Sequence, residues 1–102
     1  MPTFIFAYRM TPDFKPGGPE AYGAWATWFE GLGGSVVDMG KPAFESTAIG
    51  APAEATRLGG YSLVTADDLE SAVALAKGCP AIAAGGGVEV GLLSDVVPPP
   101  AS

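Results

Sequence analysis

The sequence that decides the fold runs from residue 58 to residue 90: LGGYSLVTADDLESAVALAKGCPAIAAGGGVEV. Its first part, Leu58–Thr65, is an apolar and β-branched run of strand length and predicts a strand. Its last part passes through the glycine run Gly85–Gly87 into a second short apolar run, which predicts a strand over Val88–Leu92. The residues between these two strands carry the signals of a helix.

Asp67 is predicted to cap this helix, because its carboxylate can accept hydrogen bonds from the first backbone N–H groups. Glu70 follows three positions later, as a capping box requires. Gly78 and Pro80 are predicted to end the helix, since glycine suits the stop and proline does not continue it. The apolar spacing predicts a buried stripe made of Leu69, Ala72, Val73 and Ala76.

The first half predicts a strand, a helix and a second strand. Thr3–Tyr8 alternates aromatic and other apolar residues and predicts a strand with two apolar faces. Pro19–Leu32 predicts a helix, since proline suits the first helical turn and Gly33-Gly34 supplies a left-handed stop. Its apolar stripe is Tyr22, Trp25, Phe29 and Leu32, widened by Trp28.

The middle of the chain predicts less regular structure. Ser35–Met39 predicts a short strand, and Phe44–Ile49 is either a further short strand or an extended loop. Gly50–Arg57 predicts a connecting loop around its proline. We expect one domain over residues 1–93 and a proline-rich, flexible tail over residues 94–102.

The order strand, helix, strands, helix, strand predicts an α+β domain of the ferredoxin-like, split β-α-β type, with two helices on one face of the sheet. The first strand is apolar on both faces, so the uncovered face needs a partner. A homodimer in which sheet faces sheet, a dimeric α+β barrel, is the simplest solution.

Composition excludes several classes of function. The net charge of −6 disfavours partnership with nucleic acid or an anionic membrane. The single cysteine, Cys79, cannot form an internal disulfide, and the N-terminus has no signal-peptide pattern, so we expect a cytoplasmic protein. The absence of histidine removes the commonest general base and metal ligand, and no zinc or calcium pattern is present, so we expect no metal and no cofactor.

The stretch from residue 58 to residue 90 closely resembles the C-terminal signature of the YCII-related family, whose larger branch carries a DGPF motif. FIFAYRM, AWATWFEGLGGSVVDMGKP and STAIG resemble its earlier segments, so the likeness covers about residues 3–92. The resemblance implies a ferredoxin-like fold and a dimeric α+β barrel. Relatives are thought to use a His–Asp pair in a cleft; here only Asp38 stands in a corresponding position, and the DGPF motif is absent.

The charged candidates for a site lie at strand ends, where loops build sites. Asp38 and Lys41 lie at the end of the second predicted strand, and a buried Asp38 beside aromatic residues would be a general base. The alternative is a turn-forming aspartate and a solvated lysine. Arg9 is either a clamp for a ligand carboxylate or a surface or interface residue.

The aromatic candidates are Tyr8, Trp28 and Tyr61, which would line a ligand pocket between helix and sheet together with the helical stripe. The alternative is that a stripe at helical spacing is core. Cys79 lacks a histidine partner and is interpreted as a packed thiol.

Three functions stay open at this point. The favoured one is a homodimeric domain that binds a small molecule, such as a carboxylate or an aromatic ligand, or serves as an accessory domain. The second is a cofactor-free hydrolase, lyase or isomerase that uses Asp38 as base and Arg9 or Lys41 as an electrostatic clamp. The third is a protein–protein assembly domain, which would expose a further apolar patch.

Overall fold

Four strands form one antiparallel sheet in the order β2-β3-β1-β4. The structure is a computed structural model that describes residues 1–13, 19–50 and 56–94. The protein is therefore a small α+β domain with a four-stranded antiparallel sheet. Its elements are β1 (Thr3–Met10), α1 (Pro19–Leu32), the 3₁₀ turn η1 (Gly33–Ser35), β2 (Val36–Asp38), β3 (Arg57–Thr65), α2 (Leu69–Ala76), α3 (Pro80–Ala83) and β4 (Gly87–Leu92).

The central strand β1 alternates strictly between buried and half-buried residues. Its buried side chains face those of its neighbours, with Phe4 opposite Val64 and Phe6 opposite Ser62 in β3. On the other side β4 pairs with β1 in a single unbroken register. A β-bulge between Tyr8 and Arg9 shifts the pairing with β3 near the end of the strand, and such bulges bend a strand and increase its twist.

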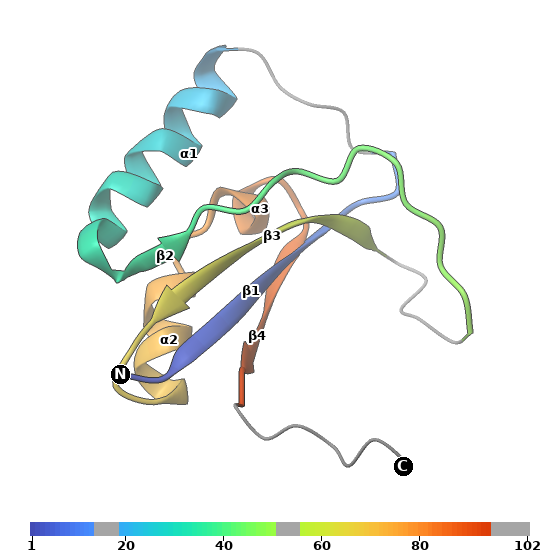
Figure 1. The fold of residues 1–102 in the computed structure, drawn as a ribbon. Helices are drawn as coiled ribbons and strands as arrows, with labels where there is room; N and C mark the ends of the chain where they lie inside the picture. Colours follow the sequence, from blue (N-terminus) through green and yellow to red (C-terminus); the bar gives the residue numbers. More distant parts are fainter. Residues whose placement is uncertain (14–18, 51–55, 95–102) are drawn as a thin grey trace.

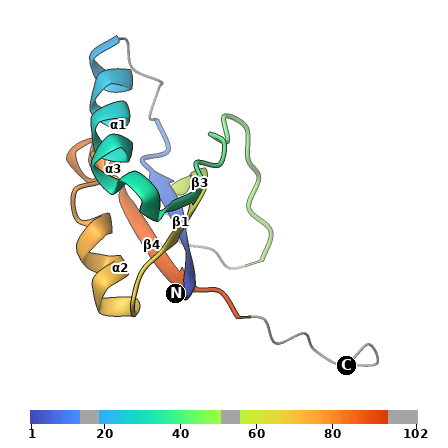
Figure 2. The same ribbon diagram turned by 60° about the vertical axis from the view of Figure 1, so that its left-hand side comes forward.

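The helices α1, α2 and α3 lie on the same side of the sheet (Figures 1 and 2). They bury the apolar face of β1 and β3, where Phe4, Phe6 and Val64 are almost inaccessible. The core is completed from the helical side by Leu32, Ala72, Ala76, Cys79 and Ala81, with Trp25, Trp28, Phe29 and Leu75 packed against it. Two helices were predicted on one face of the sheet, and the structure adds a third short one, α3, on the same side (Figure 2).

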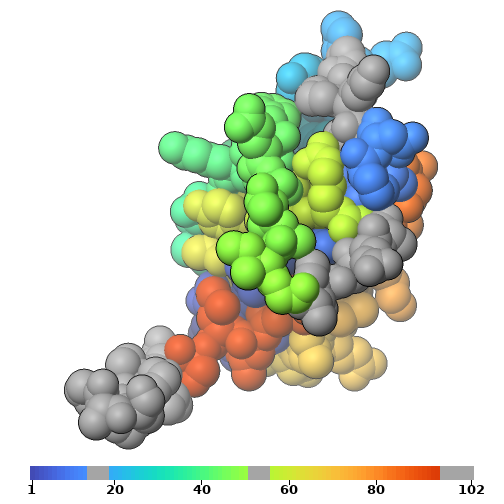
Figure 3. Space-filling view, turned by 90° about the vertical axis from the view of Figure 1, so that its right-hand side faces the viewer, coloured from blue at the N-terminus to red at the C-terminus, as the bar shows by residue number. Residues whose placement is uncertain are grey.

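The opposite face of the sheet carries no helix among the described residues (Figure 2). Ile5, Ala7 and Leu63 are half-buried there, while Leu58 and Tyr61 are exposed. We name this helix-free face of the sheet the open face. On the side seen in Figure 3, the segment that follows β2 (green) stands forward of the strands.

The cap of α2 differs from the prediction by one residue. Asp68, not Asp67, adopts the extended capping conformation, and its carboxylate accepts a 2.8 Å hydrogen bond from the backbone N–H of Ser71. Glu70 then stands in the second helical position and supports the helix dipole without a capping box. The buried stripe also differs: Ala72 and Ala76 are buried as predicted, but Leu69 and Val73 are exposed.

Other boundaries also differ. Pro80, predicted only to prevent continuation, opens the four-residue helix α3 at its first position, where its missing N–H costs nothing. Phe44–Ile49 forms no strand, and β3 already begins at Arg57, while residues 51–55 of the predicted loop lie outside the described residues. The predicted tail, residues 94–102, lies outside the described residues too, apart from Ser94.

No described helix is both long and apolar enough to cross a membrane.

Candidate functional site

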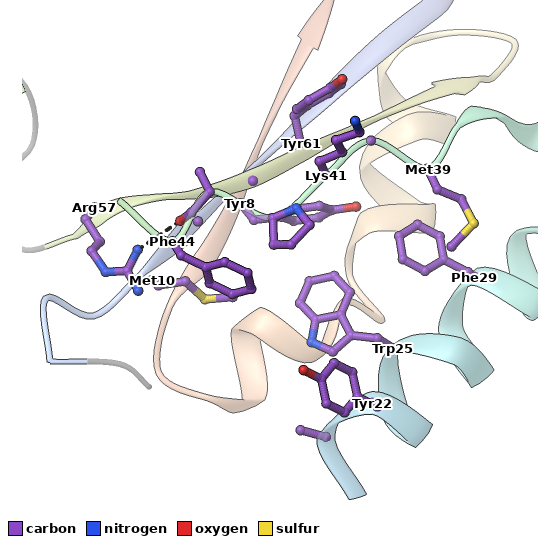
Figure 4. Close-up of a pocket in the computed structure, with 16 residues that line it drawn as sticks. Tyr8, Met10, Tyr22, Trp25, Phe29, Met39, Lys41, Phe44, Arg57 and Tyr61 are labelled. Carbon is purple, nitrogen blue, oxygen red and sulfur yellow. Dashed lines mark hydrogen bonds between the residues drawn. The ribbon is translucent and has the colours of Figure 1, made fainter. Parts of the chain in front are cut away.

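A cavity of about 250 Å³ lies between α1 and the segment 39–44, which runs beside the outer edge of β3 (Figure 4). Two backbone contacts hold this segment against β3. The N–H of Ala43 donates a 3.1 Å hydrogen bond to the carbonyl of Gly59, and Pro42 forms an isolated antiparallel bridge with Gly60. The segment therefore closes a gap that the short strand β2 leaves open. We call it the edge segment.

Glycine permits this close approach at two positions. Gly40 has φ +70°, and a Cβ atom there would overlap the carbonyl oxygen of Tyr61. Gly60 has φ +142°, and a Cβ atom there would stand 2.8 Å from the carbonyl oxygen of Lys41. Both conformations are unfavourable for side-chain-bearing residues, so the seating of the edge segment depends on these glycines.

The cavity wall is mainly aromatic and sulfur-containing. The helix α1 contributes Trp25 and Phe29, and the sheet contributes Tyr8, whose ring packs edge-on against Trp25 with centroids 4.9 Å apart. Trp25 and Phe29 are themselves 6.0 Å apart. Aromatic and thioether side chains offer broad dispersion contact to an apolar guest. The remaining large lining side chains are Met10, Tyr22, Met39 and Phe44.

A chain of hydroxyl groups runs from the cavity wall into the sheet. The phenol of Tyr8 donates a 2.7 Å hydrogen bond to Ser62, and Ser62 donates a 2.6 Å hydrogen bond to the carbonyl of Met39. Burial raises the pKa of the Tyr8 phenol well above its ordinary value, with the bond to Ser62 opposing the shift only in part. Tyr8 therefore stays a neutral hydroxyl and serves as a structural wall residue.

The charged groups at the cavity are cations. Lys41 and Arg57 belong to its lining, and no described lining residue is an aspartate or glutamate. The Arg57 guanidinium donates to the carbonyls of Ala43 and Leu58, both at 3.3 Å, which ties it to the edge segment. In Figure 4 it lies at the end of the cavity near Met10 and Phe44.

Three of the predicted site residues, Tyr8, Lys41 and Tyr61, line this cavity. In Figure 4 the side chains of Lys41 and Tyr61 lie together on the side of the strands away from Trp25. The side chains of Lys41 and Tyr61 therefore lie away from the aromatic wall of the cavity, whereas the ring of Tyr8 forms part of that wall.

Trp28 and Arg9 lie elsewhere. The indole N–H of Trp28 donates a 3.2 Å hydrogen bond to the carbonyl of Leu75 and the ring lines a second, open groove with Cys79. Arg9 donates two 3.1 Å hydrogen bonds to the side chain and carbonyl of Thr56, which fixes the entry to β3. Neither residue lines the cavity, so the predicted cluster is only partly brought together.

Asp38 is exposed at the end of β2, and its carboxylate accepts a 2.7 Å hydrogen bond from the N–H of Gly40. This is the turn-forming arrangement, not a carboxylate buried beside aromatic rings. Asp38 does not belong to the cavity lining. Its use as a general base stays a prediction that this geometry does not favour.

Cys79 is buried at 2% exposure, and burial raises the pKa of its thiol to about 11. The thiol is therefore protonated near neutral pH, and its interpretation as a packed thiol is consistent with this environment. Among the described residues no group of three or more metal-ligating side chains gathers in one place.

Several lining residues were not predicted from the sequence. They are Met10, Met39, Phe44 and Arg57, together with the two glycines that seat the edge segment. Nothing local in the sequence of 39–44 showed that this segment would lie along β3.

Comparison with known proteins gives no relative: no protein-family model, no curated protein and no solved structure matches the chain.

Proposed function

We propose that the protein binds a small, mainly apolar molecule in the cavity between α1 and the edge segment. The observation that carries this proposal is the lining, in which aromatic and methionine side chains from α1, from β1 and from the edge segment converge on one space of about 250 Å³. An apolar cavity of about 150 Å³ is enough to bind benzene. Concave, mostly apolar sites with few polar groups are typical of small-molecule binding.

The same lining favours binding over catalysis. The described lining residues include no carboxylate and no thiol, and the sequence has no histidine. The one buried hydroxyl, that of Tyr8, is already hydrogen-bonded to Ser62. Acid–base catalysis needs a group within reach of the reacting atom, and the described lining offers no carboxylate, thiol or imidazole for that role.

The proposal includes the assembly of the domain. The strand order β2-β3-β1-β4, with β3 between β2 and β1, supports a ferredoxin-like, split β-α-β arrangement. We propose that a second copy covers the open face, because Ile5, Leu63 and Tyr61 present apolar surface there. Membership of the YCII-related family stays a prediction.

A neutral two-ring aromatic amide, 2-naphthamide, tests the binding function. Trp25 and Trp28 are the two tryptophans of the chain, and they give two indole N–H signals in a nitrogen-15 NMR spectrum. Binding in the cavity shifts the Trp25 signal and leaves the Trp28 signal in place, because Trp28 is bonded to Leu75 outside the cavity.

A matched pair of variants checks the location. Ala21 lines the cavity, whereas Ala26 is exposed on the same helix and does not. Ala21→Leu fills part of the cavity and weakens binding at least tenfold. Ala26→Leu adds the same atoms at a solvent-exposed position and leaves the affinity unchanged. Equal affinities for the two variants, or no shift of the Trp25 signal at saturating amide, would contradict the proposed site.

A further inference from the structure

We infer that the ligand of this cavity is a flat, neutral aromatic carbonyl compound, whose rings lie against Trp25 and Tyr8 and whose carbonyl oxygen accepts a hydrogen bond from the indole N–H of Trp25. This inference rests on the proposed function and adds the class of ligand to it. Three observations carry it: an unused donor on the aromatic wall, the engagement of the cations that line the cavity, and the size and opening of the cavity.

The indole N–H of Trp25 has no hydrogen-bond partner among the described residues, although the ring itself is packed. Tyr8 contacts the ring edge-on, with centroids 4.9 Å apart. The other tryptophan differs, since the indole N–H of Trp28 is bonded to the carbonyl of Leu75 at 3.2 Å. The Trp25 side chain is half-buried, and every fully buried polar atom of such described side chains has a partner. The Trp25 nitrogen is therefore not fully buried, and a ligand can reach it.

An unused donor on an apolar wall selects for one kind of polar group on the ligand. An indole N–H can only donate, so the ligand must supply an acceptor. A carbonyl oxygen accepts and brings no donor that would itself need a partner, whereas a hydroxyl or an ammonium group does. A polar group that is removed from water without a partner costs free energy. The wall formed by Trp25 and Tyr8 therefore favours a carbonyl, since the Tyr8 hydroxyl already donates to Ser62.

The two cations that line the cavity favour a neutral ligand over an anion. Arg57 donates to the carbonyls of Ala43 and Leu58, and the side chain of Lys41 lies away from Trp25 in Figure 4. A carboxylate that leaves water needs a paired cation and several hydrogen bonds, and without them its desolvation costs far more than that of a neutral carbonyl. A single indole N–H satisfies a carbonyl oxygen, so the neutral group fits what the aromatic wall offers.

The size and the opening of the cavity place the two parts of the ligand. If about 150 Å³ holds the six carbons of benzene, about 250 Å³ holds roughly ten ring atoms, which corresponds to two fused rings. In Figure 4 the nitrogen of Trp25 lies at the end of its ring nearer Tyr22, and Tyr22 is 66% exposed. The carbonyl group therefore lies at the mouth of the cavity, and the rings lie deeper, against Trp25 and Tyr8.

Three probes with the same two rings test the inference on the full chain: the ketone 2-acetylnaphthalene, its hydrocarbon analogue 2-isopropenylnaphthalene and the anion 2-naphthoate. With the ketone bound, we expect the Trp25 indole proton to resonate downfield of its position with the hydrocarbon bound, because only the ketone accepts its hydrogen bond. The Trp28 signal is the internal control. The infrared carbonyl stretch of the bound ketone, labelled with carbon-13, is expected at a lower frequency than in hexane. We expect 2-naphthoate to bind at least about fivefold more weakly than the ketone.

A pair of variants measures the hydrogen bond itself by calorimetry. Trp25→Phe removes the indole N–H and keeps an aromatic ring, and we expect it to lower the ratio of ketone affinity to hydrocarbon affinity about fivefold. The ratio cancels the affinity that both probes lose with the smaller ring. Trp28→Phe is the matched control, because the Trp28 N–H is bonded to Leu75, and it leaves the ratio unchanged. If Trp25→Phe does not fold, the two spectroscopic measurements on the wild-type protein decide the matter.

The outcomes separate the two proposals. An unchanged ratio in folded Trp25→Phe, a bound carbonyl that absorbs as it does in hexane, or tighter binding of 2-naphthoate than of the ketone would overturn the inferred class. The proposed function then stands if the probes still shift the Trp25 signal. If none of the probes shifts the Trp25 signal, or if only the Trp28 signal responds, the proposed function fails as well.

Discussion

The phenol of Tyr8 and the hydroxyl of Ser62 form a buried 2.7 Å hydrogen bond between strands whose residues are far apart in the sequence. The Ser62 hydroxyl in turn donates a hydrogen bond to the carbonyl of Met39, at the start of the edge segment. One serine thus connects the central strand, its neighbour and the segment that closes the cavity. It is also the only polar residue among the fully buried side chains that the structure describes.

Ser62→Ala is expected to lower the free energy of unfolding by about 1–3 kcal/mol, because it leaves the buried Tyr8 hydroxyl and the Met39 carbonyl without their shared partner. Tyr8→Phe is the matched comparison: it removes one hydroxyl, keeps the bond from Ser62 to Met39, and is expected to cost about 1 kcal/mol. Urea unfolding of both variants measures the difference. A Ser62→Ala protein as stable as the wild type would show that the hydroxyl chain does not stabilise the sheet.

Gly40→Ala is expected to release the edge segment from β3. The added Cβ atom would overlap the carbonyl oxygen of Tyr61, and the backbone has φ +70°, so we expect a loss of about 2 kcal/mol or more. Gly23→Ala is the control, since it lies inside α1 with open space around it and should raise stability by about 0.5–1 kcal/mol. Thermal unfolding and amide exchange at Ala43 report the two effects. Unchanged exchange at Ala43 in Gly40→Ala would argue against the role given to this glycine.

Much of the fold follows from local sequence signals. The helix α1 spans the predicted Pro19–Leu32, and Gly33 at its end has φ 55°, the left-handed stop that the pattern indicates. The strand β1 could be predicted because its side chains point alternately to the two faces of the sheet, and every second residue is buried. These signals are short-range: they depend on neighbours within one or two turns of the chain.

The errors come from choices that local signals leave nearly equal. Asp67 and Asp68 are adjacent and chemically identical, so only packing selects Asp68 as the cap of α2. Leu69 and Val73 are exposed on α2, whereas Ala72 and Ala76 are buried as predicted. Proline is compatible both with the end of one helix and with the first turn of the next. Pro80 begins α3, which contacts the core through Ala81.

The candidate site was predicted only in part because its far wall is non-local. Tyr8 and Trp25 could be assigned to the sheet and helix surfaces, but the seating of 39–44 depends on Gly59 and Gly60, in a strand many residues later. Arg9, predicted either to clamp a ligand carboxylate or to be a surface or interface residue, lies outside the cavity lining for a similar reason. The bulge after Tyr8 and the alternation of β1 place Arg9 on the open face, where it binds Thr56.

The buried thiol of Cys79 predicts a loss of stability in alkaline solution. Burial raises its pKa from the ordinary 9.0 to about 11, so between these values the unfolded chain releases a proton that the folded chain keeps. The stability is fully present below pH 9 and is lost as the pH rises toward 11, by about 1 kcal/mol at about pH 10. Urea unfolding at pH 8 and at pH 10 measures this loss. Cys79→Ala should reduce the loss between the two pH values, and an identical loss in both proteins would assign it to other groups.

The open face predicts self-association. Ile5 lies in the middle of β1 on this face, so Ile5→Asp would place a charge at the centre of the proposed contact and is expected to halve the mass measured by sedimentation. Ile82→Asp is the control, because Ile82 is an exposed isoleucine on the helical side; it should leave the mass at that of two chains. Wild-type protein that sediments as a single chain at micromolar concentration would contradict the dimer. In that case the half-buried Ile5 and Leu63 would be stabilised only by their neighbours within one sheet.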